Sequence, residues 1–380
     1  MAIDFTMTTG QSMLKQTVAR LAKEKLAPRA KEIDEKAEFP WENVKALAEL
    51  GIFGLTIPEK YGGGGEGWVT LAIVTEEIAK ACVSTSTVLF CSGFVNFFLT
   101  VYGTEEQRQK YLPDLATGKK LGGWAHTEPG SGSDLETIET KAVLEGDHYV
   151  INGLKHFISN AGSAKIYVVT VSTDKTKGAR GLSQILVDSD TKGLSIGPFF
   201  NKMGIRGSHT GTVIFEDCKV PKENLLGQVG SGFKQGVQCF GEGRISVAAQ
   251  AVGLAQASYD AAREYAKQRV QYKQPIANHQ ALRFMFADMA VDISAGRLMT
   301  YQAAAAKDRG EDFIEYAAMA KVFCAEMAHR VVSKSLQMFG GYGYMKDLPI
   351  ERYYRDQRIM EIYEGTSEMA RLAIAGYQLR

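Results

Sequence analysis

The chain has 380 residues, of which 45% are hydrophobic and 23% charged, and its formal net charge is +1. That balance is ordinary for a globular enzyme and gives no electrostatic footprint for nucleic acid or for an anionic membrane surface. The length suffices for two or three domains with real cores.

Cysteine and histidine usage excludes further classes of protein. The five cysteines are widely spaced and form no C-x-x-C pair, so neither a disulfide framework nor a zinc ribbon is indicated. The six histidines show no metal-ligand spacing, and we expect no metal. The first residues lack a charged start followed by an apolar stretch, and no uninterrupted run approaches about eighteen apolar residues. We therefore expect a soluble cytoplasmic protein that binds neither nucleic acid nor a membrane.

Residues 1–120 are predicted to form an N-terminal helical domain. SMLKQTVARLAKEKLAPRAKEIDE and VKALAELGIFGL place apolar residues at intervals of three and four, as in an amphipathic helix. Residues 69–103 continue as two apolar helices, and the second is almost without charge, which indicates a helix that is buried or lines a hydrophobic cavity. The glycine-rich YGGGGEGW lacks the G-K-[ST] ending of a phosphate-binding loop and is interpreted as a turn.

Between residues 121 and 230 the hydrophobic period changes to two, which predicts a central β-domain. DHYVINGLKHFIS, KIYVVTVST, LSQILVDS and GTVIFEDCKV are β-branched or aromatic runs bounded by turn-forming residues. Their short connections suit hairpins, so an antiparallel, barrel-like sheet is favoured over parallel βαβ units. From 231 to 380 long helical patterns return, and a four-helix bundle is expected there. The predicted fold class is therefore α+β multidomain.

Several motifs could carry chemistry, although each also has an ordinary structural explanation. The loop WAHTEPGSGSD could bind an anion or a polar ring, or it could be a plain turn. Phe157 and Ser159 share one face of a strand, which simple alternation also produces. Arg269 lies between helices, where its guanidinium suits a phosphate. Glu364, in IYEGTSEM, stands between an aromatic residue and a glycine, although acidic residues are common at helix starts.

The order of these motifs is more specific than any one of them. TEPGSGSD, KHFISNAG, MGIRGSHT, GRISVAAQAVG, RVQYKQPI, QMFGGYGY and IYEGTSE follow one another along the chain. In this order they resemble the acyl-CoA dehydrogenase flavoprotein family, and its short-chain branch in particular. The resemblance runs from about residue 5 to the C-terminus. It implies non-covalent FAD, an acyl-CoA substrate, a homotetramer, and electron-transfer flavoprotein as the electron acceptor.

The resemblance also implies roles for individual residues. Glu364 matches the catalytic base, which removes the α-proton of the thioester while the β-hydride passes to flavin N5. The cofactor-binding positions are matched by Trp124, His126, Thr127, Ser133, Phe157, Ile158, Ser159, Arg269, Gln271, Tyr272, Gln280, Gln337, Gly340, Gly341, Thr366 and Glu368. Of these, Arg269, Gln271, Gln280 and residues 337–341 correspond to a site that crosses between subunits. The substrate-binding positions are matched by Ser133, Gly241, Arg244, Gly365, Cys91 and Phe94.

Some alternatives stay open. Certain branches of the family carry the base next to the arginine matched by Arg244; here that neighbour is Gly243, and Glu242 is the runner-up. His126 stands where an aliphatic residue is usual, and it could contact substrate, tune the flavin or simply be tolerated. No Lys or Arg occurs from 81 to 102, which leans against dicarboxylic acyl groups, and the phenylalanines there favour a short, branched or cyclic acyl chain.

The direction of the reaction is also open at this point. The same site could work as an enoyl-CoA reductase or as an acyl-CoA oxidase. A non-catalytic CoA-binding scaffold is disfavoured, because the matched base is present at Glu364.

Overall fold

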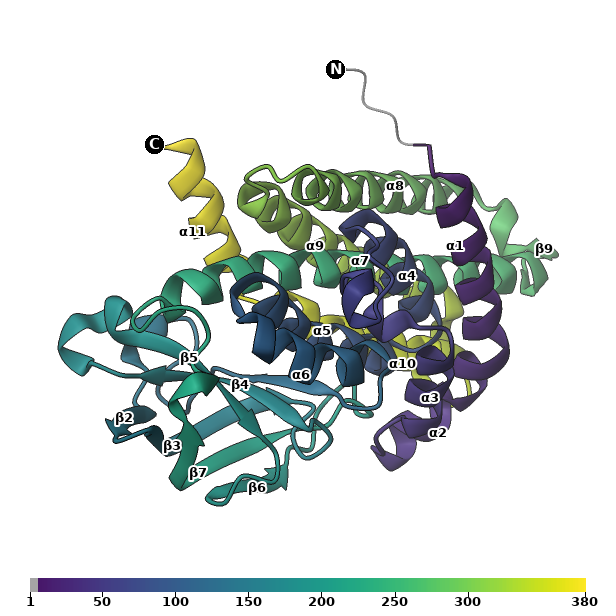
Figure 1. Ribbon diagram of the computed structural model, residues 1–380. Helices are drawn as coiled ribbons and strands as arrows, with labels where there is room; N and C mark the ends of the chain where they lie inside the picture. Colours follow the sequence, from purple (N-terminus) through teal and green to yellow (C-terminus); the bar gives the residue numbers. More distant parts are fainter. Residues whose placement is uncertain (1–5) are drawn as a thin grey trace.

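The computed structural model describes residues 6–380 and consists of an N-terminal helical part, a central β-sheet and a C-terminal helical part (Figure 1). This confirms the predicted α+β fold class. The N-terminal helices are α1 (Thr9–Leu21), α2 (Ala30–Lys36), α3 (Trp41–Glu49), α4 (Trp68–Ala81), α5 (Val83–Tyr102) and α6 (Glu105–Ala116).

The predicted helical stretch at 12–35 does not form one regular helix. A π-helical turn (Ala22–Leu26) and a 3₁₀ turn (Ala27–Arg29) interrupt it around Pro28, which has no backbone N–H to donate.

Helix α5 is enclosed on almost all sides. Among the described helices it alone is long and apolar enough to cross a membrane, but 89% of its most apolar window is buried inside the fold. It packs against β1, α6 and α7, and side chains such as Phe98 and Leu99 are completely buried there. The apolar composition of α5 is therefore accounted for by the core that it forms.

The central sheet is mostly antiparallel. Its strands are β1 (Gly122–Ala125), β2 (Lys141–Glu145), β3 (His148–Ser159), β4 (Ile166–Ser172), β5 (Leu182–Asp188), β6 (Leu194–Phe199) and β7 (Thr210–Pro221). Their order is β1-β4-β2-β3-β7-β6, with β5 paired to β4. Strand β1 pairs in parallel with β4, and β2 meets β4 in parallel at a single residue pair. This departs from the predicted hairpins, because the long segment between β1 and β4 supplies the crossover that a parallel pair needs.

The C-terminal part is built from long helices. They are α7 (Gly232–Gln268), α8 (Gln280–Asp308) and α9 (Ile314–Phe339), followed by the shorter α10 (Ile350–Gln357) and α11 (Ser367–Gln378). A two-stranded hairpin of β8 (Val270–Gln271) and β9 (Gln274–Pro275) joins α7 to α8. Helix α4 of the N-terminal part packs against both α7 and α8, so one apolar core runs through both helical parts.

Buried polar bonds hold the sheet against the helices. The Asn160 side chain at the end of β3 donates to the carbonyl oxygens of Val88 in α5 (3.2 Å) and Gly122 in β1 (3.0 Å). The Asp356 carboxylate of α10 accepts from the Ile205 N–H at 2.6 Å, and burial raises the pKa of this carboxyl to about 6. These bonds fix the junction between the sheet and the helices.

Candidate active site

The turn that carries Glu364 is strained. Glu364 has φ 56° and Gly365 has φ 85°, immediately before the Thr366 cap of α11. The left-handed region is easy for glycine, but for a glutamate it costs roughly 1–2 kcal/mol. A non-glycine residue in this conformation marks a place where the surrounding structure fixes the backbone, often at a functional site.

Several hydrogen bonds hold this turn in place. The Arg244 Nε of α7 donates to the Glu364 carbonyl oxygen at 3.3 Å. The Lys321 Nζ of α9 donates to the Gly365 carbonyl oxygen at 2.6 Å. Just before the turn, the Tyr363 hydroxyl donates to Gln250 Oε1 at 2.5 Å. Two buried cations and a tyrosine thus fix the backbone on both sides of the carboxylate.

The Glu364 carboxylate rests against a glycine of α7. A Cβ atom built on Gly243 would lie 2.3 Å from Glu364 Oε2, so only glycine leaves room for the carboxylate there. Glu364 as a whole is half-buried, but its Oε2 is enclosed and has no hydrogen-bond partner within residues 6–380. Burial raises the pKa of this carboxyl to about 7, although Arg244 and Lys321 oppose the rise. A desolvated carboxylate with one free oxygen is suited to accept a proton near neutral pH.

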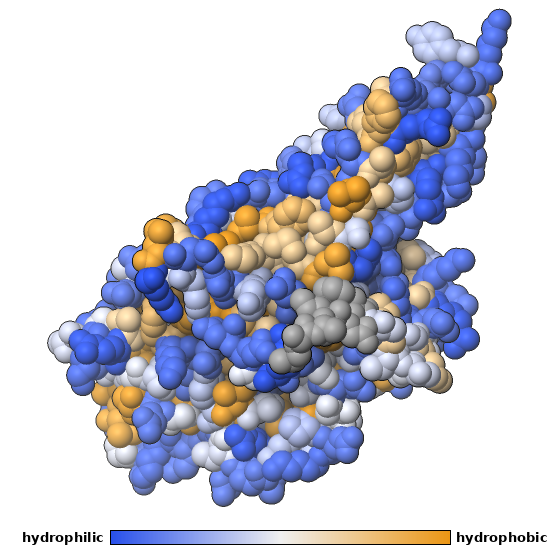
Figure 2. All heavy atoms as spheres, turned by 90° about the horizontal axis from the view of Figure 1, so that it is seen from above, coloured by the Kyte–Doolittle hydropathy of each residue, from blue (hydrophilic) through white to orange (hydrophobic). Residues whose placement is uncertain are grey.

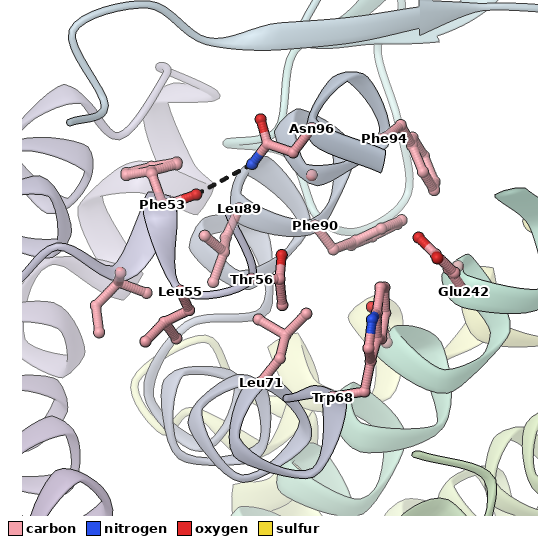
Figure 3. Close-up of a pocket in the computed structure, with 14 residues that line it drawn as sticks. Phe53, Leu55, Thr56, Trp68, Leu71, Leu89, Phe90, Phe94, Asn96 and Glu242 are labelled. Carbon is pink, nitrogen blue, oxygen red and sulfur yellow. Dashed lines mark hydrogen bonds between the residues drawn. The ribbon is translucent and has the colours of Figure 1, made fainter. Parts of the chain in front are cut away.

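Gly243, against which this carboxylate rests, also lines a small cavity. The cavity measures about 30 Å³ and is bounded by α4, α5, α7 and the segment 52–56. Figure 3 shows Phe90 and Phe94 of α5, Trp68 of α4 and Glu242 of α7 turned toward one another around it. Phe94, one of the residues matched to substrate binding, therefore lies next to the glycine that accommodates Glu364.

Cys91 and Gly241, two other predicted substrate positions, are buried on nearby helices. Burial raises the pKa of the Cys91 thiol, and the charge of Glu364 raises it further. Gly241 faces the start of α9, because a Cβ built there would lie 2.4 Å from Ile314 Cδ1. The structure thus gives Gly241 a helix-packing role. Ser133, in contrast, is exposed in the loop after β1.

Trp124 and His126 stand at the end of β1 and face the helices. The Trp124 ring packs on Phe94, Phe98 and Phe240, and its Nε1 donates to Thr170 Oγ1 at 3.1 Å. His126 is 6% exposed and its Nδ1 lies 2.8 Å from the same hydroxyl. Burial lowers the pKa of His126 to about 3, so this imidazole is neutral. Its Nε2 has no partner in the described part of the chain.

A β-bulge turns Phe157 toward solvent. The register between β3 and β7 shifts between Lys155 and Ile158, and Phe157 takes φ 56°. As a result the Phe157 ring is 60% exposed while the Ile158 side chain is 2% exposed in the core of the sheet. The His156 N–H donates to the Thr127 carbonyl oxygen at 2.7 Å, which joins the bulge to the loop after β1. An outward aromatic ring beside backbone polar groups suits a flat, polar-edged ring such as a flavin.

The loop after β1 is anchored by a buried ion pair. Lys155 is fully buried, and its Nζ lies 2.7 Å from Glu128 Oε1 and 2.9 Å from the His126 carbonyl oxygen. Glu128 also accepts from the backbone N–H groups of Glu139 (2.6 Å) and Thr140 (2.9 Å). The glutamate of TEPGSGSD is therefore structural, and it fixes where Thr127 presents its backbone.

The remaining predicted cofactor residues fall into two groups. Thr366 caps α11 by accepting from the Met369 N–H at 3.3 Å, and Glu368 is exposed in the first turn of that helix. The others lie around the hairpin between α7 and α8, which Figure 1 places at the end of the molecule away from the sheet. We call this second group the hairpin cluster, and it consists of Arg269, Gln271, Tyr272, Gln280, Gln337, Gly340 and Gly341.

The hairpin cluster is open to solvent and well suited to an anion. Arg269, Gln271, Gly340 and Gly341 line one open cavity of about 550 Å³, and Tyr272 is 90% exposed. Nothing lies within 4 Å of a Cβ built on either glycine, so a ligand can approach the backbone closely. Within one chain the structure does not bring this cluster together with Phe157.

Three lysines of the site region, two of them buried and one partly buried, have roles that the motifs did not indicate. They are Lys155, Lys321 and Lys307, and the first two are completely buried. The sequence feature that could have revealed them is a single charged residue on an apolar helix face. Lys321 is an example, because Ala317 and Cys324 lie on the same side of its helix. Lys307 of α8 lies 5.8 Å from the Phe97 ring, so a neighbouring helix brings a cation to α5 although residues 81–102 contain none.

Comparison with known sequences assigns most of the chain to the three domains of one family. Residues 8–119 match the description "Acyl-CoA dehydrogenase, N-terminal domain", residues 123–218 match "Acyl-CoA dehydrogenase, middle domain", and residues 230–378 match "Acyl-CoA dehydrogenase, C-terminal domain". Together these matches cover most of the chain, including the strained turn, the bulge and the hairpin cluster.

Individual relatives agree with these matches. The chain is 44% identical to a short-chain specific acyl-CoA dehydrogenase of Clostridium acetobutylicum, over 98% of this chain and 99% of the relative. It is 43% identical to an acryloyl-CoA reductase (NADH) of Anaerotignum propionicum, over 98% of this chain and 95% of the relative. The structure of butyryl-CoA dehydrogenase from Megasphaera elsdenii superposes with a TM-score of 0.98 at 39% identity, and each chain is covered completely.

Proposed function

Because the chain belongs to the acyl-CoA dehydrogenase family of FAD-dependent oxidoreductases, we propose that Glu364 is the base that removes the α-proton of an acyl-CoA thioester. One observation carries this assignment: Glu364 Oε2 is enclosed against Gly243, a residue that also lines a small cavity, and it has no hydrogen-bond partner in the described chain. Glu242, the alternative carboxylate, is already engaged with Lys307. A base must have a free oxygen within reach of the proton that it takes.

The chain's own residues prepare this proton transfer. The pKa of about 7 lets Glu364 hold the α-proton at neutral pH, and Arg244 and Lys321 keep the turn from relaxing. We expect the same turn to present the Glu364 backbone N–H to the thioester oxygen, where negative charge develops. Bound FAD supplies the acceptor for the β-hydride. Thr127 and residues 157–159 would hold its ring, and Arg269, Gln271, Gly340 and Gly341 of a neighbouring subunit would hold its phosphates.

The acyl group is proposed to be short, branched or cyclic. The cavity beside Glu364 is only about 30 Å³, and the rings of Phe90, Phe94 and Trp68 limit its extent. A second carboxylate on the acyl chain would face Glu242, and two like charges in a low-dielectric cavity repel strongly. Both features favour a compact acyl chain without a second carboxylate.

We also propose a homotetramer that works in the cytoplasm and passes electrons to electron-transfer flavoprotein. Helix α8 carries exposed apolar side chains at a spacing of seven, with Phe284 61%, Val291 69% and Leu298 44% exposed. Figure 2, which looks down on the upper face of Figure 1, shows apolar side chains gathered in a band along the molecule. Such a stripe suits subunit contact. A flavin-loaded monomer in light scattering would contradict the tetramer.

A second candidate is the reverse reaction, the reduction of an enoyl-CoA. The acryloyl-CoA reductase relative, 43% identical over nearly the whole chain, gives this candidate its support. The same base and flavin site would serve, with Glu364 delivering the α-proton instead of taking it. Reoxidation of the reduced flavin by acryloyl-CoA or crotonyl-CoA, with no bleaching by the saturated thioesters, would favour this direction.

The first test is an anaerobic titration of the FAD-loaded protein with linear, branched, cyclic and dicarboxylic acyl-CoA thioesters, followed by flavin absorbance. We expect bleaching by short, branched or cyclic members of the panel and none by glutaryl-CoA. Electron-transfer flavoprotein, added next, should reoxidise the flavin. A protein that binds no FAD, or whose flavin responds to neither saturated nor unsaturated thioesters, would overturn the proposed function.

A further inference from the structure

The cavity lined by Gly243 is otherwise bounded by aromatic, aliphatic and uncharged polar residues, but one lining residue, Glu242, carries a carboxylate. Glu242 is 3% exposed and lines the cavity next to Gly243, the residue on which the Glu364 carboxylate rests. Figure 3 shows the Glu242 carboxylate pointing into the space between Phe90, Phe94 and Trp68. An acyl chain whose α-carbon lies at Glu364 and whose far end enters this cavity would therefore meet Glu242.

The negative charge of Glu242 is compensated by Lys307 of α8. Lys307 Nζ lies 2.5 Å from Glu242 Oε1, and it also lies 4.5 Å from the Phe313 ring centroid and 5.1 Å from that of Trp68. Lys307 itself does not line the cavity, so a ligand meets the carboxylate and not the cation. Burying such a pair is costly compared with two apolar residues of similar size, and buried pairs can be retained for specificity.

The Glu242–Lys307 pair is neutral as a whole, and this indicates which chemical group of a ligand fits beside it. A carboxylate on the acyl chain would be repelled by Glu242, and an ammonium group would leave an uncompensated positive charge in a buried site. A plain methyl end would pack against the Glu242 carboxylate without giving it a hydrogen bond. A hydroxyl group is uncharged and can donate to Glu242, and the Thr56 hydroxyl lies in the same wall.

We propose that Glu242, backed by Lys307, selects acyl groups that carry a hydroxyl at their far end. This inference rests on the proposed function, and it concerns only which acyl chain is preferred. The cavity of about 30 Å³ leaves room for one or two small groups beyond the reacting carbons, so the hydroxyl belongs on a compact chain.

The test compares kcat/KM for matched pairs of CoA thioesters with four to six acyl carbons, each pair ending in either methyl or primary hydroxyl. For the wild-type enzyme we expect the hydroxyl member of the best pair to be preferred by about 10- to 100-fold, the effect of one hydrogen bond to a charged acceptor. The double variant Glu242→Met/Lys307→Met removes the pair without leaving a lone charge, and the preference should then reverse toward the methyl member. The exposed pair Arg309 and Glu311, replaced in the same way, is the matched control and should leave the ratio unchanged.

The outcomes separate the two proposals. Bleaching by the methyl-ended thioesters with no preference for the hydroxyl at any chain length would overturn the role of Glu242 and leave the proposed function intact. An unchanged hydroxyl preference in the double variant would also overturn it. If the double variant does not bind FAD, Glu242→Gln gives the answer, because a neutral amide oxygen is a weaker acceptor and the hydroxyl preference should fall. Flavin that responds to neither series contradicts the proposed function itself.

Discussion

The Glu364 turn and the hairpin cluster are built in opposite ways, although both are matched to one kind of enzyme. The turn is held by buried groups from α7 and α9, and one chain completes it: Gly243, Arg244 and Lys321 all contact Glu364 or Gly365. The hairpin cluster is exposed, and Tyr272, with φ 50°, extends its ring into solvent. Residues of the same chain enclose the Glu364 turn, whereas the hairpin cluster exposes its side chains to solvent.

This difference separates two physical requirements. A base needs a raised pKa and a fixed position, and both depend on burial. A site for a dianionic cofactor needs donors that stay accessible until the ligand or a neighbouring subunit covers them. We therefore expect variants at the turn to change chemistry without changing FAD content, and variants at the hairpin cluster to do the opposite.

The largest effect should come from Glu364→Gln. The amide cannot take a proton, so kcat should fall by about 10³-fold or more while FAD binding is unchanged. Reduction of the flavin by substrate in stopped-flow absorbance measures the loss. Glu326→Gln, which removes a carboxylate paired with Arg371 on the surface, is the control. Turnover near the wild-type rate in Glu364→Gln would show that another residue is the base.

Gly243→Ala should come next. The new Cβ would lie 2.3 Å from Glu364 Oε2 and must displace the carboxylate, so we expect about a 100-fold loss of kcat with normal FAD content. Gly376→Ala is the matched helical control, because nothing lies within 4 Å of a Cβ built there. Equal rates for the two alanine variants would show that the carboxylate does not depend on this close approach.

Arg269→Ala tests the hairpin cluster. Loss of a charge-assisted hydrogen bond should weaken FAD affinity by about 10- to 100-fold, measured by equilibrium dialysis or fluorescence, and added FAD should restore kcat. Arg263→Ala removes an exposed arginine of the same helix that contacts Asp260, Glu264 and the Tyr259 ring, and this variant should bind FAD normally. Full FAD affinity in the Arg269→Ala enzyme would contradict the proposal that the hairpin cluster binds the cofactor.

The smallest expected effect concerns pH. Since the pKa of Glu364 is raised to about 7, kcat/KM should rise as pH increases through that value, because the ionised form is the base. Lys321 opposes the rise, so Lys321→Met should move the profile to higher pH, with Lys334→Met on the same helix as control. A purely structural loss would instead lower kcat/KM equally at all pH values.

The hydrophobic patterns predicted the fold class, and the motifs pointed to the carboxylate that we propose as the base. The change of hydrophobic period near residues 121 and 231 follows from side-chain directions in strands and helices, which local sequence records. The order of motifs through IYEGTSEM identified the family and singled out Glu364, because short segments that contact a cofactor or substrate keep a recognisable residue pattern. Strand β1, with only four residues, was too short to give such a signal.

Tertiary structure alone decided how these segments meet. The parallel pairing of β1 with β4, the outward turn of Phe157 and the burial of Lys321 all depend on partners far away in sequence. The absence of Lys and Arg from residues 81–102 was the reason to disfavour dicarboxylic acyl groups, but that segment alone did not show that α7 brings Glu242 into the cavity wall and that α8 brings Lys307 to pair with it. A residue's charge is written in the sequence, but whether that charge is buried, paired or aimed at a ligand depends on which elements pack against it.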